Sequence, residues 1–449
     1  MEKISLFKNV FKTVPAYSKF FGKNKIPKEI NWNEIPIMTK ENYLTKFPMN
    51  ELYRRGSLKN CFLIGTSSGF SKGGSLFWPK ESVDEKNYIE KVKELLIKDY
   101  SIDKRTTLII VNLALGTWIG GMQLACTFRN LASQMEGVAV STPGMNLKEG
   151  ANIVKKFGEF FEIVLWVTNP SSINIISYLM QEEKELLKGK IFFPVVGEYF
   201  SENFREDIAK RFGHDPKNPV VVKTGYGSAD TGDLGIETVE TIMLRKFFLE
   251  NPEKSVEFFK EESPPMLLAP SSKAFIEIID GEIVVTKDQF IPLIRYNTKD
   301  TGGIIPREKV KDLVDKDLFK KLPENILYVF GRAKNSIIFY GTNLNVNKIG
   351  NFFESLDREF YYGGLFEVRK IKIENMNFFE FTIYTTNPGK NLKEKYKEKL
   401  LEFLKNFSNE FAAKYDELKS AAGRDLISVK IANINEKEKA KKHKIIIEE

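Results

Sequence analysis

Cysteine and histidine are scarce in this sequence, which has only two residues of each among 449. Cys61 and Cys126 each lie in an apolar run without the spacing of a disulfide framework, which favours a reducing compartment such as the cytoplasm. His214 and His443 stand far apart and no cysteine cluster accompanies them, which argues against a zinc site.

Long uninterrupted hydrophobic segments are also lacking. The N-terminus shows no apolar core followed by a small-residue cleavage site, so no signal peptide is expected. The most membrane-like stretch, 108–126, contains Asn112, Thr117, Gln123 and three glycines. It therefore predicts a buried strand that leads into a packed helix, and no membrane span.

Neither sign of charge dominates the chain. The 68 basic and 60 acidic residues leave a net charge of +8, and the lysines are interleaved with glutamates. This pattern is typical of a solvated surface, so we expect no nucleic-acid partner. Hydrophobic residues, at 42%, are ordinary for a globular protein, and the length predicts more than one domain. The oligomeric state stays open, with a homodimer as one alternative.

Expected strands and helices alternate in the first half of the chain. The strands are predicted at 107–113, 162–167, 191–196 and 220–223, and the helices at 81–97, 151–157, 173–187 and 202–212. This order predicts α/β layers with a largely parallel sheet, in which ligands gather beyond the carboxyl ends of the strands. Further along, Asp280-Gly281 between two alternating runs predicts a β-hairpin.

The last part of the chain has a different pattern. Helices are predicted at 349–356 and 390–418, and strands at 366–374, 378–385 and 427–434. This is the pattern of a small α+β domain. We therefore expect an N-terminal domain over 1–330 and a C-terminal domain over 331–449, with the boundary at 331–335. The chain ends in a lysine run followed by an apolar triplet, which suggests that the tail docks.

A glycine-rich segment, GTSSGFSKGGS at 65–75, lies between the apolar runs 61–64 and 76–78. It predicts a strand, a flexible turn and a second strand. Glycines let successive backbone N–H groups point into one concavity, and Lys72 adds a charge, so this turn could hold a polyphosphate. It is not a Walker A loop, because Ser75 stands where that motif needs lysine. A glycine-rich hairpin with a solvated lysine is the alternative.

Two polar turns follow expected strands, at Gly197-Glu198 and at 224–230. In the second turn, Tyr226 could stack on a purine and Asp230 could hold Mg²⁺ through oxygen. An ordinary loop between a strand and a helix, with Asp230 as the helix N-cap, is the alternative, and composition alone favours it.

Eight segments follow one another in an informative order along the chain. They read PIMTKENYLTKFP, GTSSGFSKGGS, GTWIGGMQ, VVGEYF, YGSAD, IPLIRYNTKD, GRAKNSIIFYGTNL and KKHKIII. In this order the chain resembles the AMP-forming adenylating enzymes, the acyl- and aryl-CoA ligase superfamily, and within it the phenylacetate–CoA ligase-like branch. The resemblance covers nearly the whole chain. It implies that the N-terminal domain binds ATP and the acid, and that a mobile C-terminal domain carries a catalytic lysine.

The resemblance also implies a role for each site residue. Phosphate binding falls to Thr66, Ser67, Ser68, Gly69, Ser71, Lys72 and Gly73. Adenine and ribose binding falls to Gly197, Glu198, Tyr226, Gly227, Asp300 and Arg332. The remaining roles are Mg²⁺ support for Asp230, the hinge for Lys334, the catalytic lysine for Lys442, and an apolar acid pocket for Trp118 and Tyr199. Aromatic residues in such runs can equally belong to the core.

Several positions depart from the pattern of the family. Lys72 stands where the loop usually has glycine, and Asp230 replaces the usual glutamate. The tail lacks the usual glycine before its lysine, so Lys441, Lys442 and Lys444 compete for the catalytic role. These departures leave open a nucleotide-binding homologue with impaired catalysis.

The implied chemistry consists of two half-reactions. A carboxylate first attacks the α-phosphorus of ATP and forms an acyl-adenylate, which requires cations and N–H donors where negative charge develops. A thiol then attacks the acyl carbon and AMP leaves. Coenzyme A is the expected thiol, and a carrier-protein or enzyme thiol is the alternative. The sequence does not identify the acid.

Overall fold

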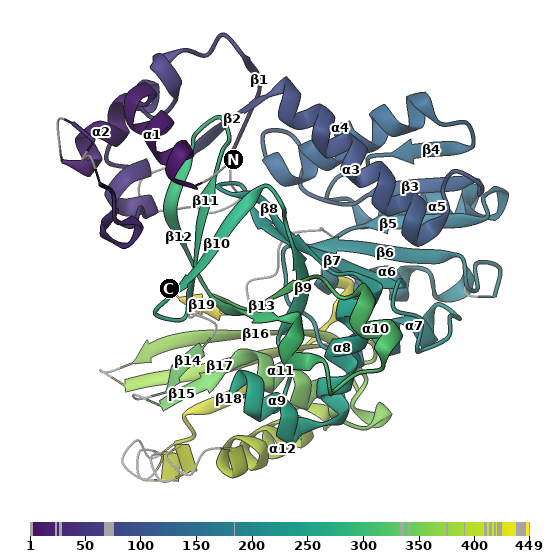
Figure 1. Ribbon diagram of the computed structural model, residues 1–449. Coiled ribbons are helices and arrows are strands. Elements are labelled where there is room, and N and C mark those ends of the chain that lie inside the picture. Colours follow the sequence, from purple (N-terminus) through teal and green to yellow (C-terminus); the bar gives the residue numbers. More distant parts are fainter. Residues whose placement is uncertain are drawn as a thin grey trace.

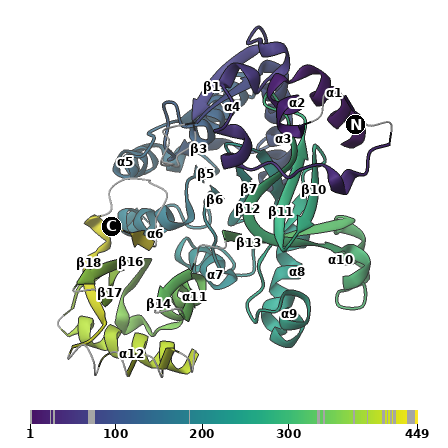
Figure 2. The ribbon, with the colours of Figure 1, turned by 90° about the vertical axis from the view of Figure 1, so that its left-hand side faces the viewer.

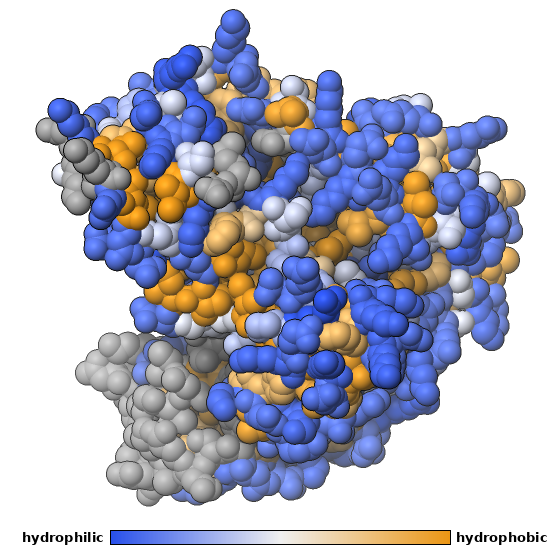
Figure 3. Space-filling view, viewed as in Figure 1, coloured by the Kyte–Doolittle hydropathy of each residue, from blue (hydrophilic) through white to orange (hydrophobic). Residues whose placement is uncertain are grey.

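The structure is a computed structural model that divides into a large N-terminal part and a small C-terminal domain (Figure 1). It describes residues 3–22, 25–26, 29–66, 76–183, 185–332, 336–339, 342–373, 376–389, 391–407, 411–412, 415–416, 419, 424–436 and 446–448. Among these residues, no helix is both long and apolar enough to cross a membrane. On the face in Figure 3, hydrophilic residues cover most of the surface and hydrophobic residues form patches between them.

The chain begins with two short helices, α1 (Lys3–Thr13) and α2 (Pro15–Phe21). They are separate because Val14, which precedes a proline, adopts an extended conformation. Both helices bury aromatic side chains in a cluster that includes Trp78 and Tyr296. Thr39 caps the helical turn that follows it, because its side chain accepts a hydrogen bond from the backbone N–H of Asn42.

An 11-stranded sheet forms the centre of the N-terminal domain. Its order is β10 (Ala274–Ile279), β11 (Glu282–Lys287), β12 (Leu293–Pro306), β13 (Asn325–Arg332), β9 (Met266–Pro270), β8 (Gly232–Ile236), β7 (Val222–Ser228), β6 (Ile191–Val196), β5 (Ile163–Val167), β3 (Thr107–Val111) and β4 (Val138–Ser141). A separate antiparallel pair, β1 (Cys61–Thr66) and β2 (Phe77–Glu81), flanks the glycine-rich segment. The predicted hairpin at Asp280-Gly281 is confirmed, and both residues have positive φ.

The expected α/β class is confirmed, but the sheet is mixed and not largely parallel. Only the half from β7 to β4 is parallel, and the half from β10 to β7 is antiparallel. The parallel half corresponds to the predicted alternation of strands and helices. In the other half, short connections join β7 to β8, β10 to β11 and β11 to β12, and such connections permit only antiparallel pairing.

Helices pack on the parallel half of the sheet. They are α3 (Ser82–Tyr100), α4 (Ile119–Gln134), α5 (Leu147–Phe157), α6 (Pro170–Leu179) and α7 (Glu202–Arg211). Helices α8 (Val239–Glu250), α9 (Pro252–Phe259) and α10 (Lys316–Lys321) belong to the other half. The stretch 108–126 is a buried strand leading into α4, as predicted, whereas α6 ends earlier than expected, at Leu179.

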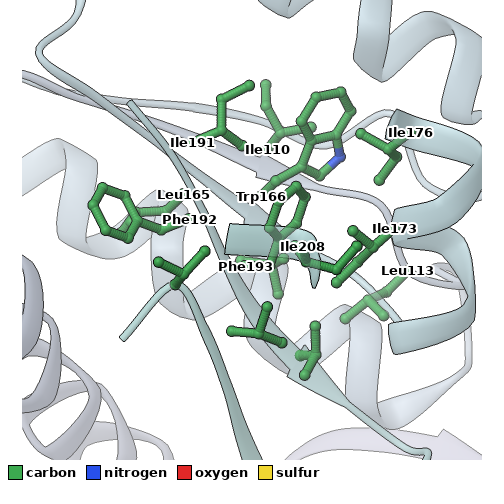
Figure 4. Close-up of a cluster of buried hydrophobic side chains, with 14 of the residues drawn as sticks. Ile110, Leu113, Leu165, Trp166, Ile173, Ile176, Ile191, Phe192, Phe193 and Ile208 are labelled. Atoms are coloured by element: carbon green, nitrogen blue, oxygen red, sulfur yellow. The ribbon is translucent and has the colours of Figure 1, made fainter. Parts of the chain in front are cut away.

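Large apolar side chains fill the core of the parallel half (Figure 4). Trp166 stacks against Phe193 at a ring distance of 6.4 Å, and its indole N–H donates to buried Asn112 at 2.7 Å. Asn112 in turn donates to the carbonyl oxygen of Gly144 at 2.8 Å. The buried polar groups at the end of β3 therefore satisfy one another, as a low-dielectric interior requires.

The C-terminal domain has its own core and a four-stranded sheet (Figure 2). The sheet order is β18 (Ile427–Asn433), β17 (Met376–Thr385), β16 (Tyr362–Ile373) and β19 (Ile446–Glu448). The domain also contains the hairpin β14 (Ser336–Phe339) and β15 (Thr342–Asn345), and the helices α11 (Val346–Ser355) and α12 (Leu392–Phe407). The expected docking of the tail is confirmed for β19, which pairs in parallel with β16.

Helix α11 joins the two domains through polar contacts. Glu354 accepts a hydrogen bond of 2.6 Å from the hydroxyl of Ser201, which also caps α7. Lys348 pairs with Glu261 at 3.0 Å. Glu354 is half-buried, and burial raises the pKa of its carboxyl to about 7 despite the hydrogen bond from Ser201. Burial therefore favours the protonated carboxyl, whereas the hydrogen bond from Ser201 favours the carboxylate.

We expect the stability of the protein to fall as Glu354 ionises. Because burial raises its pKa, the contribution is complete below pH 4.5 and is lost as the pH rises through about 7. The shift corresponds to at most about 3 kcal/mol. The other charged and titratable groups near the carboxyl are Asp207, Arg211, Tyr199 and Tyr362.

Urea unfolding between pH 5 and 9 measures this effect. The Glu354→Gln variant should lose the part of the pH dependence centred near 7, whereas Glu359→Gln, at an exposed position of the same domain, should keep it. An unaltered pH profile in Glu354→Gln would show that this carboxyl does not titrate in that range.

Candidate functional site

The segment around Tyr226 belongs to a strand and not to a loop. Sequence reasoning placed a turn at 224–230, but β7 continues to Ser228, and a tight turn then leads into antiparallel β8. The helix that Asp230 would cap is therefore absent at this point, and the capping alternative is wrong. Gly227 is required here, because a Cβ atom would lie 2.3 Å from the carbonyl oxygen of Gly232.

Tyr226 and Asp300 meet across the sheet. The phenol of Tyr226 on β7 donates a hydrogen bond of 2.7 Å to the Oδ2 atom of Asp300 on β12. The backbone N–H of Asp300 also donates to the hydroxyl of Thr298 at 3.2 Å. These contacts hold the Asp300 carboxylate beside the aromatic ring, although the two residues lie 74 positions apart in the sequence. Two residues that the sequence resemblance assigns to the nucleotide site are thus in direct contact.

Asp230 is held against the same strand. The phenol of Tyr296 donates to its Oδ2 atom at 2.6 Å, and the Gln289 side chain donates to its backbone carbonyl at 2.6 Å. A carboxylate has about four lone-pair sites. The hydrogen bond from Tyr296 uses one of them, so the Asp230 carboxylate can still bind a hard cation. No group of three metal-binding side chains occurs within the described part of the chain. If Asp230 holds Mg²⁺, substrate phosphates and water would complete the coordination of the ion, which is its usual arrangement.

The Gly197-Glu198 turn follows β6 directly. Gly197 is exposed and has a φ of +93°, a conformation in which other residues are strained. A Cβ atom there would lie 3.2 Å from the Asn169 amide, which donates to the carbonyl oxygen of Val196. Glycine therefore lets the chain turn sharply at a strand end next to β7.

The start of the glycine-rich segment lies against α4. Thr66 is buried, and its backbone N–H donates to the carbonyl oxygen of Thr117 at 2.7 Å. A Cβ atom at Gly65 would lie 2.7 Å from the Ile119 side chain, so only glycine permits this approach. Half-buried Trp118 forms a bridge to Thr66. The predicted phosphate-binding residues Ser67, Ser68, Gly69, Ser71, Lys72 and Gly73 lie outside the described residues.

Tyr199 lines a cavity of about 110 Å³ between the domains. The cavity also contacts Ser201, Arg245 and Ser263 from the N-terminal domain and Asn351 from α11. The guanidinium of Arg245 lies 5.3 Å from the centre of the Tyr199 ring. Trp118, which we expected to share an acid pocket with Tyr199, is not among the residues that line this cavity.

The predicted residues of the hinge and the tail cannot be placed. Lys334 and the three candidate lysines of the tail lie outside the described residues, namely Lys441, Lys442 and Lys444. Arg332 lies opposite Asp300 in the register of β12 and β13. The backbone at the end of the N-terminal domain therefore passes next to the proposed ribose site.

A buried ion network supports the site and was missed from the sequence. Arg205 donates to Glu202 at 2.9 and 3.0 Å and to Glu237 at 2.7 Å, and Arg245 donates to Glu202 at 2.9 Å. Glu237 also accepts from the backbone N–H of Thr224, two residues before Tyr226. One signal was available, because Arg205 lies on the same face of α7 as the apolar residues Ile208 and Ala209.

Charge pairing offsets the cost of burying these groups. Burial alone would raise the pKa of Glu202, but the guanidinium groups of Arg205 and Arg245 outweigh it and hold that pKa below its usual value. Burial would also lower the pKa of Arg205, and the carboxylates of Glu202 and Glu237 raise it instead. Glu202 and Arg205 therefore stay ionised together.

Comparison with known proteins gives matches among solved structures. No protein-family model and no curated protein matches the chain. The chain is similar to 2-hydroxyisobutyryl-CoA ligase in the postadenylation state in complex with 2-HIB-AMP, with a TM-score of 0.68 and 11% identity over 100% of this chain and 88% of that one. The acyl acid amido synthetase AtGH3.15, in complex with 2,4-DB, gives a TM-score of 0.56 and 10% identity over 96% and 87%.

A second structure of the first relative differs in state. In complex with 2-HIB-AMP and CoA in the thioesterification state, 2-hydroxyisobutyryl-CoA ligase gives a TM-score of 0.54 and 11% identity over 99% of this chain and 88% of that one. The chain thus has the fold of the adenylate-forming ligases, as the sequence resemblance implied. The phenylacetate–CoA ligase-like branch stays a prediction.

Removal of Arg205 should destabilise the protein strongly. Arg205→Met leaves Glu202 and Glu237 with less compensation in the interior, which should cost about 3–5 kcal/mol of unfolding free energy. Arg211→Met on the same helix is the matched control, since the Arg211–Asp207 pair is partly exposed and should contribute about 1 kcal/mol or less. Urea unfolding monitored by circular dichroism measures both, and equal losses would contradict the role of the network.

Proposed function

We propose that this protein is an ATP-dependent ligase that activates a carboxylic acid as an acyl-adenylate and transfers the acyl group to a thiol. Coenzyme A is the proposed acceptor. The observation that carries the proposal is the 2.7 Å contact between Tyr226 and Asp300. It joins an aromatic face and a fixed carboxylate within a fold that also occurs in a ligase solved with an acyl-adenylate.

Asp300 is proposed to bind the ribose of ATP. A carboxylate can accept two hydroxyl groups while it keeps one further hydrogen bond. The hydrogen bond from Tyr226 occupies part of Oδ2 and orients the carboxylate. The ring of Tyr226 would then stack on adenine, while the Gly197-Glu198 turn and Gly227 border the base. Arg332 would complete the ribose site from β13.

Asp230 is proposed to support Mg²⁺ bound to the phosphates of ATP. When bound, this ion would offset negative charge on the phosphates. Tyr296 keeps the Asp230 carboxylate in one orientation through its 2.6 Å hydrogen bond. Thr66 and the glycine-rich residues after it are proposed to bind the phosphates themselves. Trp118 and Tyr199 are proposed to border the acid, which we expect to be an aromatic or acyl acid.

A rotation of the C-terminal domain is proposed between the two half-reactions, with the hinge at Lys334. The TM-score of 0.68 against the postadenylation state, compared with 0.54 against the thioesterification state of the same ligase, supports this idea. The contacts of α11 with Ser201 and Glu261 would then belong to one of the two domain orientations.

An exchange assay tests the function directly. The protein should catalyse exchange of labelled pyrophosphate into ATP only when a suitable carboxylic acid is present, and a panel of aromatic and aliphatic acids identifies the acid. Release of AMP should then depend on coenzyme A. If AMP release depends instead on a carrier-protein thiol or on an amine, that group and not coenzyme A is the acceptor. A folded protein that binds ATP without exchange on any acid would support an impaired homologue.

Replacement of Asp300 should weaken ATP binding. Asp300→Ala removes a charged hydrogen-bond partner, which should cost on the order of 1.5–3 kcal/mol of binding free energy. Tyr226→Phe should show a smaller loss, since the carboxylate stays but is less restrained. Isothermal titration calorimetry measures both, with Asp103→Ala at an exposed turn as the control. Unchanged ATP affinity in folded Asp300→Ala would contradict the proposed ribose site.

Lys442 is proposed to act only in the first half-reaction, because a long side chain can place a point charge between the carboxylate and the α-phosphate. Lys442→Ala should therefore abolish acid-dependent exchange and still convert a supplied acyl-adenylate to thioester. Lys441→Ala and Lys444→Ala should have milder effects, and Lys430→Ala, at an exposed position on β18, is the control. Normal exchange in all the tail variants would exclude a catalytic lysine there.

A further inference from the structure

The turn between β7 and β8, residues Ser228–Asp233, is held from outside by side chains of β11 and its continuation. We call it the site turn, because it carries Asp230. Within it, Ser228 accepts from the backbone N–H of Thr231 at 3.2 Å, and the two hydroxyls lie 3.0 Å apart. Gly232 has a φ of +62°, so the backbone reverses sharply before β8.

Lys287 lies under this turn, at the end of β11. Its side chain is nearly fully buried, and its ammonium group donates to the carbonyl oxygens of Thr231 at 2.7 Å and Asp233 at 2.8 Å. A Cβ atom on Gly232 would lie 3.2 Å from the same nitrogen. The ammonium group therefore binds the carbonyls on both sides of Gly232, in a place where a buried cation needs such partners.

Asp233 balances the charge of this lysine. Its Oδ1 atom lies 3.7 Å from the Lys287 ammonium, and its Oδ2 atom accepts from Lys91 of α3 at 2.6 Å and from Ser271 at 3.1 Å. Burial would raise the pKa of Asp233, but Lys287 and Lys91 lower it to about 2. Asp233 therefore stays ionised at neutral pH.

Gln289, two residues after Lys287, also binds a backbone carbonyl of the site turn. Its amide donates to the carbonyl oxygen of Asp230 at 2.6 Å, and Tyr296 donates to the carboxylate of Asp230. Lys287 thus binds the backbone carbonyls of residues 231 and 233, and Gln289 binds that of residue 230. Tyr296 binds the carboxylate of Asp230. The carbonyls of the site turn are fixed by donors on a neighbouring part of the sheet.

We propose that Lys287 is a positioning residue for Asp230, and that its buried ammonium group fixes the site turn in the conformation that presents this carboxylate. The assignment of Asp230 to Mg²⁺ rests on the proposed function, whereas the effect of Lys287 on the turn does not. Lysine suits this place because three N–H donors on a flexible stem can reach two carbonyls and one carboxylate at once.

Hydrogen exchange in the ligand-free protein tests the positioning role. Lys287→Met keeps the length of the side chain and removes the charge and the donors. Exchange of the backbone amides in 231–233 should become at least about tenfold faster, because hydrogen bonds to a charged group contribute at least one power of ten. Lys273→Met, at an exposed position before β10, should leave these amides unchanged. Wild-type exchange in folded Lys287→Met would overturn the proposal.

A second variant covers the case in which Lys287→Met does not fold. Gln289→Leu affects a half-buried side chain and removes only the donor to the carbonyl of Asp230. It should accelerate exchange at the site turn by a few fold. If the amides of this variant also exchange at the wild-type rate, the side-chain hydrogen bonds to the carbonyls do not stabilise the site turn, and the proposal fails.

Titration calorimetry with ATP at several Mg²⁺ concentrations tests the link to Asp230. The Mg²⁺ concentration needed for half-maximal ATP affinity should rise about tenfold in Lys287→Met and stay unchanged in Lys273→Met. Faster amide exchange with an unchanged Mg²⁺ dependence would separate Lys287 from the metal and overturn its role for Asp230. A wild-type protein that binds no ATP would refute the proposed function and leave the result on the turn standing.

Discussion

The buried ion network of Glu202, Arg205, Glu237 and Arg245 is the constraint on which the site depends. It connects α7 and α8 with the ends of β7 and β8, and Glu237 binds the backbone N–H of Thr224 directly. Charges in a low-dielectric interior are tolerated only when each finds a partner in good geometry. The four residues therefore define the position of β7 before the strand reaches Tyr226.

From that fixed point the candidate site is built by contacts to one other strand. β12 provides Asp300 to Tyr226 and Tyr296 to Asp230, and the segment just before it provides Gln289. The ammonium group of Lys287 donates hydrogen bonds to two backbone carbonyls of the site turn. Polar side chains held in this way lose little freedom when a nucleotide binds, and such preorganisation is what an electrostatically demanding reaction needs.

The contacts of the C-terminal domain with this framework are of two kinds. Leu365, Tyr384, Ala432 and Ile434 share the main hydrophobic core of the N-terminal domain. The polar contacts of α11 include a glutamate whose pKa is raised to about 7 by burial. Burial makes the ionised form of this glutamate costly, so its burial between the domains is readily reversed, which is compatible with the domain rotation proposed between the half-reactions.

From local patterns in the sequence we predicted the alternation of strands and helices, a large α/β part followed by a small α+β part, and the hairpin at Asp280-Gly281. These features depend on local periodicity and turn chemistry, that is, on residues that are close together in the sequence. The turn from β7 into antiparallel β8, the contact between Tyr226 and Asp300, and the burial of Arg205 and Lys287 became visible only in the folded chain. Pairing between residues 74 positions apart and the balance of buried charges depend on how distant segments pack, and no local pattern contains that information.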